Sequence, residues 1–225
     1  MISWRHLPAS WIPPLGQMAY DDELFSEYKP NDPPILRFFS FPVPTLTLGR
    51  LEARRLPLQT LPFPHEIRPT GGRGVLHGEG DLCYAIMASK QDPIVGGDLI
   101  DSYCRIGKLL ARGLQSLGRK VRMTQEKHLG LGDPHCFSAP SQAELTLNGK
   151  KVAGGAQARR GEVFLQQGVI LLSVAEEWKK AFPGSGLETM TGLNEDPALS
   201  AVSRFELEKA ILSSFEEAGI SFSQA

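Results

Sequence analysis

The sequence predicts an α+β domain with a mixed, mainly antiparallel sheet and flanking helices. Three observations favour this class. Short strand-like segments are joined by hairpin signals, of which Asn148-Gly149 is the strongest. Amphipathic or capped helical segments lie between and after the strand-rich blocks. The 225 residues, with 41% hydrophobic content, suffice for one packed core, so we expect a single domain over residues 1–225.

In the first half of the chain we expect one helix followed by several short strands. Residues 12–28 have helix-like apolar spacing. ILRFF (35–39) and TLTL (45–48) are typical of strands joined by a proline-containing bend. A proline-rich loop over 51–64 then leads into residues 66–87, which predict a strand, a glycine-rich loop and a second strand.

The second half is expected to alternate helices and hairpins. Asp98 is a good N-cap for a helix over 99–117, and Gly118 is its expected C-terminal stop. The other expected elements are a short strand over 120–124, a loop over 128–141, strands over 143–147, 150–158 and 162–173, a short helix over 174–182, and a helix from the capping box Ser203-x-x-Glu206 to just before Gly219.

Composition excludes several classes of protein. A formal net charge of −1 provides no global attraction to nucleic acid or anionic lipid. No stretch has the ~18 apolar residues of a membrane helix, and the N-terminus lacks a signal-peptide pattern. The three cysteines lack zinc-ligand spacing, so we expect reduced thiols in a cytoplasmic protein and no metal site. Lys150-Lys151 and Arg159-Arg160 are local basic clusters, which are most often solvated faces.

Five of the 23 glycines lie within 66–87, a segment that also holds Arg68 and His77. Gly71-Gly72 in this segment and Gly154-Gly155 later each lie in or beside a predicted strand, where glycine often marks close approach of a ligand. Two interpretations stay open. The pairs are unrelated turns or bulges, or they are opposite walls of one slot that admits a slim apolar chain and has a cation at its polar end.

Cys136 has the most distinctive setting of the three thiols, a Gly/Pro-rich loop of the kind that often presents reactive groups. It is either a nucleophile whose thiolate a nearby cation stabilises or an unreactive loop residue. Cys83 and Cys104 are expected to be inert packing residues. His77 is an acid, a donor to a ligand, or a histidine satisfied within the fold. Walker, GxSxG and HExxH motifs are absent.

RPTGGRGVLH (68–77) resembles the RRxxGGGxVxH signature of the lipoate–protein ligase and octanoyltransferase superfamily. GKKVAGGAQ (149–157) resembles the GKKIxGxAQ signature, and LQQGVILL (165–172) resembles the LQHGTLLL strand. LRFFSFPVPTLTLGR (36–50) and QMAYDD (17–22) are similar to two further segments, and all five occur in the family's order. The resemblance implies a catalytic domain of the biotin/lipoate ligase type.

Within the superfamily, CFSAPS (136–141) is similar to the nucleophile loop of the cysteine-dependent octanoyltransferases of the ligase-like type. This resemblance implies that Cys136 accepts the acyl group and that Lys151 is the active-site lysine. The residues after Asp196 are few, so no C-terminal accessory domain is expected. The implied substrate-binding residues are Arg68, Gly71, Gly72, Arg73, His77, Gly154 and Gly155. The family's LQHG histidine is replaced by Gln167, whose role the resemblance leaves open.

The implied reaction moves an octanoyl group from acyl carrier protein to a lysine of a lipoyl-domain protein, such as the glycine cleavage H protein or a 2-oxoacid dehydrogenase E2. Cys136 would carry the octanoyl group as a thioester, and no metal or nucleotide cofactor is expected. Three rivals stay open. These are an ATP-dependent lipoate–protein ligase catalytic domain, an amidotransferase acting between two lipoyl-domain proteins, and a non-catalytic binder of acyl groups or lipoyl domains. No nucleic acid or membrane partner is expected.

Overall fold

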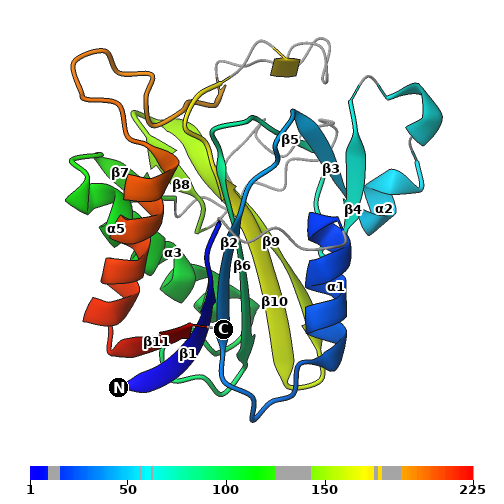
Figure 1. Ribbon diagram of the computed structural model, residues 1–225, viewed down its shortest axis with the longest axis vertical. Helices are drawn as coiled ribbons and strands as arrows, with labels where there is room; N and C mark the ends of the chain where they lie inside the picture. Colours follow the sequence, from blue (N-terminus) through cyan, green and yellow to red (C-terminus); the bar gives the residue numbers. More distant parts are fainter. Residues whose placement is uncertain are drawn as a thin grey trace.

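The structure is a computed structural model that describes residues 1–9, 16–55, 57–61, 63–124, 143–174, 177–178 and 189–224. It contains a mixed eight-stranded sheet and, beside one face of it, a three-stranded sheet (Figure 1). The predicted α+β class is confirmed. In spatial order the large sheet contains β11 (Ile220–Gln224), β1 (Ile2–Leu7), β2 (Ile35–Phe39), β6 (Leu82–Ser89), β10 (Val163–Ile170), β9 (Lys150–Arg160), β8 (Leu145–Leu147) and β7 (Val121–Met123).

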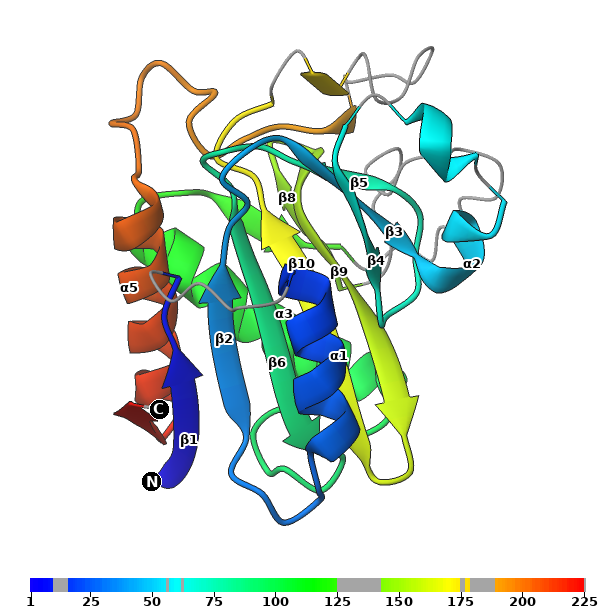
Figure 2. The same cartoon turned by 45° about the vertical axis from the view of Figure 1, so that its right-hand side comes forward.

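The smaller sheet carries the glycine-rich segment and faces the large sheet from one side. Its strands are β4 (His65–Arg68), β3 (Thr45–Gly49) and β5 (Val75–His77), with β3 in the centre. Together with helix α1 (Gln17–Glu27) it covers one face of the large sheet, and helices α3 (Leu99–Ser116) and α5 (Arg204–Glu217) cover the other (Figure 2). The large sheet is therefore buried on both sides around β6 and β10.

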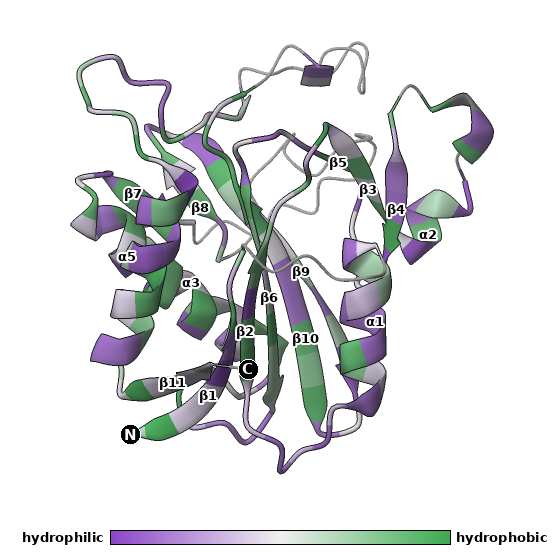
Figure 3. Cartoon of the chain, in the orientation of Figure 1, coloured by the Kyte–Doolittle hydropathy of each residue, from purple (hydrophilic) through white to green (hydrophobic). Residues whose placement is uncertain are grey.

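The burial of β6 shows how the two cores form. Seven of its eight residues are buried, because alternate side chains enter opposite cores. Tyr84 and Ile86 pack on the side of α3 and α5, whereas Cys83, Ala85 and Met87 pack on the side of α1. Figure 3 shows hydrophobic colouring along β6, whereas α1 and α5 also carry hydrophilic stretches.

Both long helices of the second half begin and end as predicted. The Asp98 side chain accepts a hydrogen bond from the Asp101 backbone N–H at 2.8 Å, and Gly118 follows α3 with φ +75°. Ser203 and Glu206 form both halves of the capping box that begins α5. Gly219 follows that helix with φ +94°, so glycine permits the left-handed turn that ends it.

The hairpin between β8 and β9 contains the irregularity that matters for the site. Asn148 and Gly149 have φ of 52° and 80°, which fits the predicted type I′ turn. Next to the turn, Thr146 pairs with Lys151, but Leu145 pairs with Ala153. Val152 is therefore an extra residue in β9, a β-bulge that changes which face of the sheet its neighbours point to.

Several local expectations need correction or cannot be assessed. The segment 51–64 is not all loop, since it contains a helical turn, α2 (Arg50–Ala53), and the 3₁₀ turn η1 (Leu58–Thr60). The first helix begins at Gln17 within the described chain. The expected loop over 128–141 and most of the expected helix over 174–182 lie outside the described residues. Within the described residues, no helix combines the length and the apolar character needed to cross a membrane.

Candidate active site

A pocket lies between the two sheets and contains about 430 Å³ of empty space, its open mouth included. One wall comes from β9 and β10 of the large sheet, and the facing wall comes from the three-stranded sheet. The lining residues are Met18, Phe39, Thr47, Arg68, Val75, His77, Lys151, Gly154, Gly155, Ala156, Gln167, Gly168 and Val169. Five of the residues singled out from the sequence therefore meet in one place: Arg68, His77, Lys151, Gly154 and Gly155.

Lys151 reaches this pocket because of the bulge at Val152. In a regular strand, residues three apart point to opposite faces of the sheet. The extra residue puts Lys151 on the same face as Gly154, and the lysine side chain then lies across that glycine. A Cβ added at Gly154 would lie 2.7 Å from the Lys151 Cε and 3.0 Å from its Nζ. Glycine at this position is thus what leaves room for the lysine.

The Lys151 ammonium is paired with a carboxylate that the sequence analysis missed. Its Nζ lies 2.7 Å from an oxygen of Glu144, and the two side chains are 1% and 7% exposed. A buried charge without a partner is strongly disfavoured, and removing one member of such a pair costs about 3–5 kcal/mol. Glu144 therefore offsets the cost of burying the Lys151 ammonium at the pocket wall.

The second glycine of the pair and Gly168 make room on the opposite face of the sheet. Tyr84, Gly168 and Gly155 are paired across β6, β10 and β9. A Cβ at Gly168 would lie 2.4 Å from the Tyr84 ring, and one at Gly155 would lie 3.1 Å from the Tyr84 hydroxyl. The tyrosine ring thus lies flat against bare backbone, which keeps this wall of the pocket thin and free of side chains.

Arg68 shapes the glycine-rich loop. Its guanidinium donates hydrogen bonds to the Thr47 carbonyl and hydroxyl at 2.8 and 2.6 Å. It also donates to the carbonyls of Gly71 at 3.1 Å and Arg73 at 2.6 Å. Because the guanidinium is buried, these four acceptors fix the path of the loop after β4 and bring it back toward β3.

Gly71, Gly72 and Arg73 do not line the pocket within the described chain. Gly72 has φ +92°, and its carbonyl would lie only 2.2 Å from a Cβ at Gly49. The loop backbone therefore packs directly on the end of β3. The hypothesis that Gly71-Gly72 forms the wall opposite Gly154-Gly155 needs correction, because the facing wall comes from Thr47, Val75 and His77 instead.

His77 is satisfied within the fold and neutral. Its Nε2 lies 2.7 Å from the Thr47 hydroxyl, and its Nδ1 lies 3.1 Å from the Cys83 sulfur. Burial, together with the nearby Arg68, lowers the pKa of His77 to about 3. Burial also raises the pKa of the Cys83 thiol well above its usual value. This Cys–His contact is consequently a pair of neutral groups and does not form a thiolate–imidazolium dyad.

Gln167 connects the pocket wall to α1 and the glycine-rich loop. Its side-chain oxygen accepts from the Thr70 hydroxyl at 2.8 Å, and its amide nitrogen donates to Asp21 at 2.6 Å. The same nitrogen lies 3.3 Å from the Met18 sulfur. Asp21 is in turn paired with Arg37 at 2.5 Å. Gln167 thus ties β10, α1 and the glycine-rich loop together through buried polar contacts.

Cys136 and the rest of the segment 125–142 lie outside the described residues. The two ends of that segment meet beside the ion pair. The Ala143 N–H donates to the Thr124 carbonyl at 3.1 Å, and the Thr124 N–H donates to the Glu144 carbonyl at 2.9 Å. Cys104 is half-buried in α3. Within the described residues, no cluster of three or more His, Cys, Asp or Glu side chains is arranged to hold a metal ion.

Two polar residues of the site, Glu144 and Thr47, were not predicted from the sequence. The position of Glu144 could have been predicted from the hairpin. The two-residue turn sets the pairing of Thr146 with Lys151, so both side chains point to the same face of the sheet. Glu144 lies two residues before Thr146 and therefore points to that face too. Reading the hairpin register would have suggested this acid–base contact. Thr47 left no comparable signal, since nothing in TLTL marks its hydroxyl as the partner of both Arg68 and His77.

Comparisons with known proteins identify the family of the chain. The profile of the family described as the lipoyl protein ligase A/B catalytic domain matches residues 13–191. Octanoyltransferase LipM of Carboxydothermus hydrogenoformans is 37% identical over 180 residues, which cover 77% of this chain and 66% of that protein. Octanoyltransferase LipM of Bacillus subtilis is 32% identical over 190 residues, which cover 78% of this chain and 67% of that protein. The matched region thus spans about two thirds of these relatives' length.

Solved structures share the fold. A putative lipoate protein ligase from T. acidophilum with bound lipoic acid superposes with a TM-score of 0.79, at 21% identity, over all of this chain and 89% of the other. A lipoate-protein ligase A bound with ATP gives the same TM-score and identity, with the same coverage. At this identity the likeness concerns the fold alone.

Proposed function

The chain belongs to the lipoyl protein ligase A/B catalytic domain family, and we propose that it is an octanoyltransferase. In this proposal a single catalytic domain over residues 1–225 takes an octanoyl group from acyl carrier protein. It passes the group to a lysine of a lipoyl-domain protein, such as the glycine cleavage H protein or a 2-oxoacid dehydrogenase E2. Cys136 carries the octanoyl group between the two, and the reduced thiol that this requires suits a cytoplasmic setting.

One observation carries the proposal: a buried ammonium lies against a pocket wall of bare backbone. Lys151 lies across Gly154 there, with Gly155 next along the wall, while Met18, Phe39, Val75 and Val169 give the pocket apolar walls. A saturated acyl chain matches the apolar walls, and its carbonyl end matches the cation. Burying the chain contributes about 0.8 kcal/mol per CH₂, enough to select for an acyl group over a shorter one.

The chemistry divides into two balanced steps. In the first, the Cys136 thiolate attacks the carbonyl of the octanoyl thioester, the bond to the carrier's sulfur breaks, and the carrier leaves as a thiolate while the octanoyl group becomes attached to Cys136. In the second, the neutral ε-amine of the acceptor lysine attacks that new thioester. An amide forms, the amine releases one proton to solvent, and Cys136 leaves as a thiolate ready for another cycle. A thiol suits both roles, since it is a good nucleophile and a good leaving group.

Lys151 would act on both steps as a fixed cation. Its ammonium stabilises the Cys136 thiolate and donates to the developing oxyanion, a contribution worth about 2.7–4 kcal/mol per donor in other enzymes. Glu144 acts through Lys151 and is a positioning residue, because its carboxylate pairs with the ammonium at 2.7 Å. Arg68 and Gln167 support the pocket from behind by holding the glycine-rich loop and α1 in place.

The decisive experiment is intact-mass analysis after mixing with octanoyl-acyl carrier protein. One octanoyl group should appear on the peptide containing Cys136 and disappear with hydroxylamine, which cleaves thioesters. Cys136→Ala should abolish both this adduct and transfer to a lipoyl-domain protein. Cys83→Ala and Cys104→Ala are matched controls that remove the other two thiols and should retain the adduct. An adduct that survives Cys136→Ala would refute the assignment.

The same assay separates the rival activities. A ligase requires ATP and free lipoate or octanoate, whereas the proposed transferase needs only the carrier thioester. An amidotransferase would accept an octanoylated lipoyl-domain protein as donor in preference to the carrier protein. Transfer from the carrier without ATP, and at a higher kcat/KM than from an octanoylated lipoyl domain, is the outcome expected here.

A further inference from the structure

The outer side of α3 and the strand after it have the most one-sided charge in the described chain. Residues 102–124 contain six Lys or Arg residues and no Asp or Glu, in a protein whose net charge is −1. Arg119 is buried, where it donates to the Ser200 carbonyl. The other five are exposed and define what we call the basic face: Arg105, Lys108, Arg112, Lys120 and Arg122.

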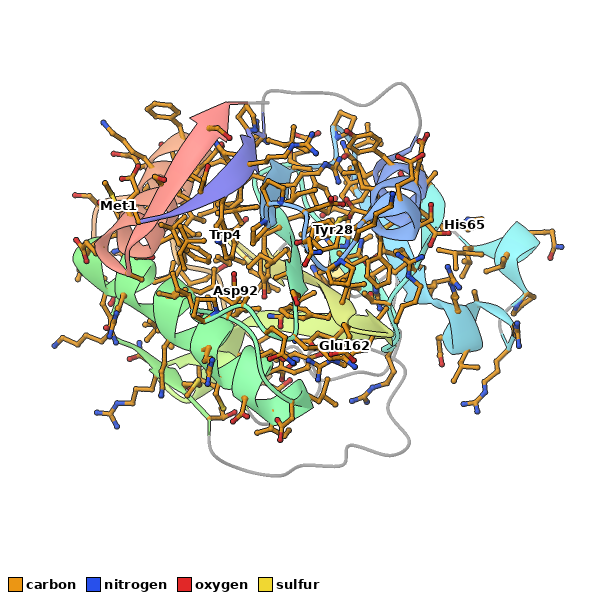
Figure 4. The ribbon with its side chains drawn as sticks, turned by 90° about the horizontal axis from the view of Figure 1, so that it is seen from below. Met1, Trp4, Tyr28, His65, Asp92 and Glu162 are labelled. Atoms are coloured by element: carbon orange, nitrogen blue, oxygen red, sulfur yellow. The ribbon has the colours of Figure 1, made fainter. Side chains whose placement is uncertain are left out.

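The basic face differs from an ordinary solvated helix surface. Within the described part of the chain, none of its five cations forms an ion pair. Arg105, Lys108 and Arg112 are spaced so that they follow one side of the helix over two turns. Helix α5 offers the contrast, because its surface mixes both signs, with Lys209 among Glu206, Glu208 and Glu216. In Figure 4 side chains with nitrogen tips project outward from the green helix.

The basic face is close to the pocket wall. On the inner side of α3, the Tyr103 hydroxyl donates to the Gly155 carbonyl at 3.4 Å. An α-helix with its side chains is about 10–12 Å across, so the outer surface of α3 lies about one helix diameter from that wall. In the described chain β8 pairs with β9 only as far as Ala153, and from Gly154 to Ala156 the strand is half-exposed.

We propose that the basic face docks the acyl carrier protein, an inference that rests on the proposed function. Charge complementarity favours an acidic partner, and carrier proteins are acidic and helical. The distance from the basic face to the pocket suits the acyl donor and not the acceptor protein. The carrier presents its thioester on a long flexible arm, which can span a helix diameter and reach the pocket around the edge of β9. An acceptor lysine has only four methylenes, so its protein must dock at the pocket mouth itself.

The test reverses the charge of the helical part of the basic face in the full chain: Arg105→Glu, Lys108→Glu and Arg112→Glu together. At low salt, KM for octanoyl-carrier protein should rise at least tenfold, and the difference should shrink as salt is added. Two kinetic constants should stay within twofold of the unaltered protein: kcat/KM with octanoyl-pantetheine, a neutral donor without a protein part, and KM for the lipoyl-domain acceptor.

A matched control makes the same change in net charge elsewhere. Arg54→Glu, Arg55→Glu and Lys209→Glu reverse three exposed cations outside the basic face and should leave the carrier KM within twofold. An unchanged carrier KM in the first variant would overturn the proposal, and so would a rise in the acceptor KM instead. Direct titration of carrier binding needs no catalysis. A failure of the proposed function, seen as no transfer from either donor, is thereby distinguishable from a failure of docking.

Discussion

Gly154-Gly155 lies within strand β9, whereas Gly71-Gly72 lies in the loop between β4 and β5. Side chains lie against both strand glycines: a Cβ at Gly154 would meet Lys151, and one at Gly155 would meet Tyr84 as well as the Gln167 carbonyl. The loop pair faces backbone on one side and nothing on the other. Gly72 packs against Gly49, but a Cβ at Gly71 would have no heavy atom within 4 Å.

This difference shows that a glycine pair next to a cation has at least two meanings. In the strand, the missing side chains leave the space that Lys151 and Tyr84 occupy. In the loop, the missing side chains let the main chain turn and pack closely. The nearby cation, Arg68, donates its hydrogen bonds to loop carbonyls. The four experiments below probe this contrast, beginning with the largest expected effect.

Gly154→Ala should reduce octanoyl transfer about 100-fold while leaving the protein folded. The new methyl would lie 2.7 Å from the Lys151 Cε and 3.0 Å from a Glu144 oxygen, so the ion pair must shift. Displacing a catalytic group by about 1 Å can cost about 10²-fold. Kinetics with octanoyl-carrier protein and a thermal melt would measure the two effects. Full activity would show that the lysine does not need this glycine.

Arg68→Ala should destabilise the protein by about 2–4 kcal/mol, because it strands the carbonyls of Thr47, Gly71 and Arg73 that the buried guanidinium now satisfies. Urea unfolding measures the loss. Arg68→Lys should recover little of it, since an ammonium cannot reproduce the forked geometry. If Arg68 acted only on substrate, both variants would keep the stability of the unaltered protein.

Asp81 joins the turn after β5 to the chain just after β10, because it accepts from the Gly78 N–H at 2.9 Å and from the Leu172 N–H at 3.0 Å. Burial raises the pKa of Asp81 to about 7. The unfolded chain releases this proton near its ordinary value of 3.8, so the folded state binds more protons between pH 4 and 7. The contribution of Asp81 to stability should therefore fall as pH rises through this window, by up to about 1.4 kcal/mol per unit.

Asp81→Asn removes the titrating carboxyl group, so the part of the pH dependence of stability that comes from Asp81 should disappear. The free energy of unfolding, measured at pH 5 and pH 8 for both proteins, gives the comparison. The advantage of the unaltered protein over the variant should be larger at pH 5. An equal change in the free energy of unfolding between pH 5 and pH 8 in the two proteins would contradict the raised pKa.

Gly71→Ala should have the smallest effect, within about 0.5 kcal/mol in stability and twofold in transfer. Its backbone does not need a positive φ, and the added methyl would enter open space. This variant is the matched control for Gly154→Ala, since both add one methyl to one member of a glycine pair. A loss as large as that of Gly154→Ala would place Gly71 at the substrate after all.

The sequence predicted the features that depend on neighbours along the chain. The cap at Asp98, the capping box at Ser203 and the Asn148-Gly149 turn each involve atoms a few residues apart, and all three are confirmed. Strands β1 and β11 were not predicted. They pair with each other in parallel, residue 2 with residue 220, and no local pattern encodes a partner so distant.

The sequence allowed us to predict which segments form the site, but not how their side chains contact one another. Family signatures brought Lys151, Gly154 and Gly155 forward correctly as neighbours in one pocket. They gave no sign of Glu144, because an ion pair across a hairpin depends on register and on one extra residue. The role of Cys136 stays a prediction, since the cysteine lies outside the described residues.

The bulge at Val152 means that a small deletion can redirect Lys151 without removing it. The side of the sheet on which the ammonium emerges depends on the number of residues between Lys151 and Ala153. Loss of the Val152 codon would leave Lys151 and its neighbouring glycines in the sequence, yet it would turn the ammonium toward the helices. A frame-preserving deletion of three nucleotides can thus move the lysine out of the pocket while a motif search still finds it and its glycines.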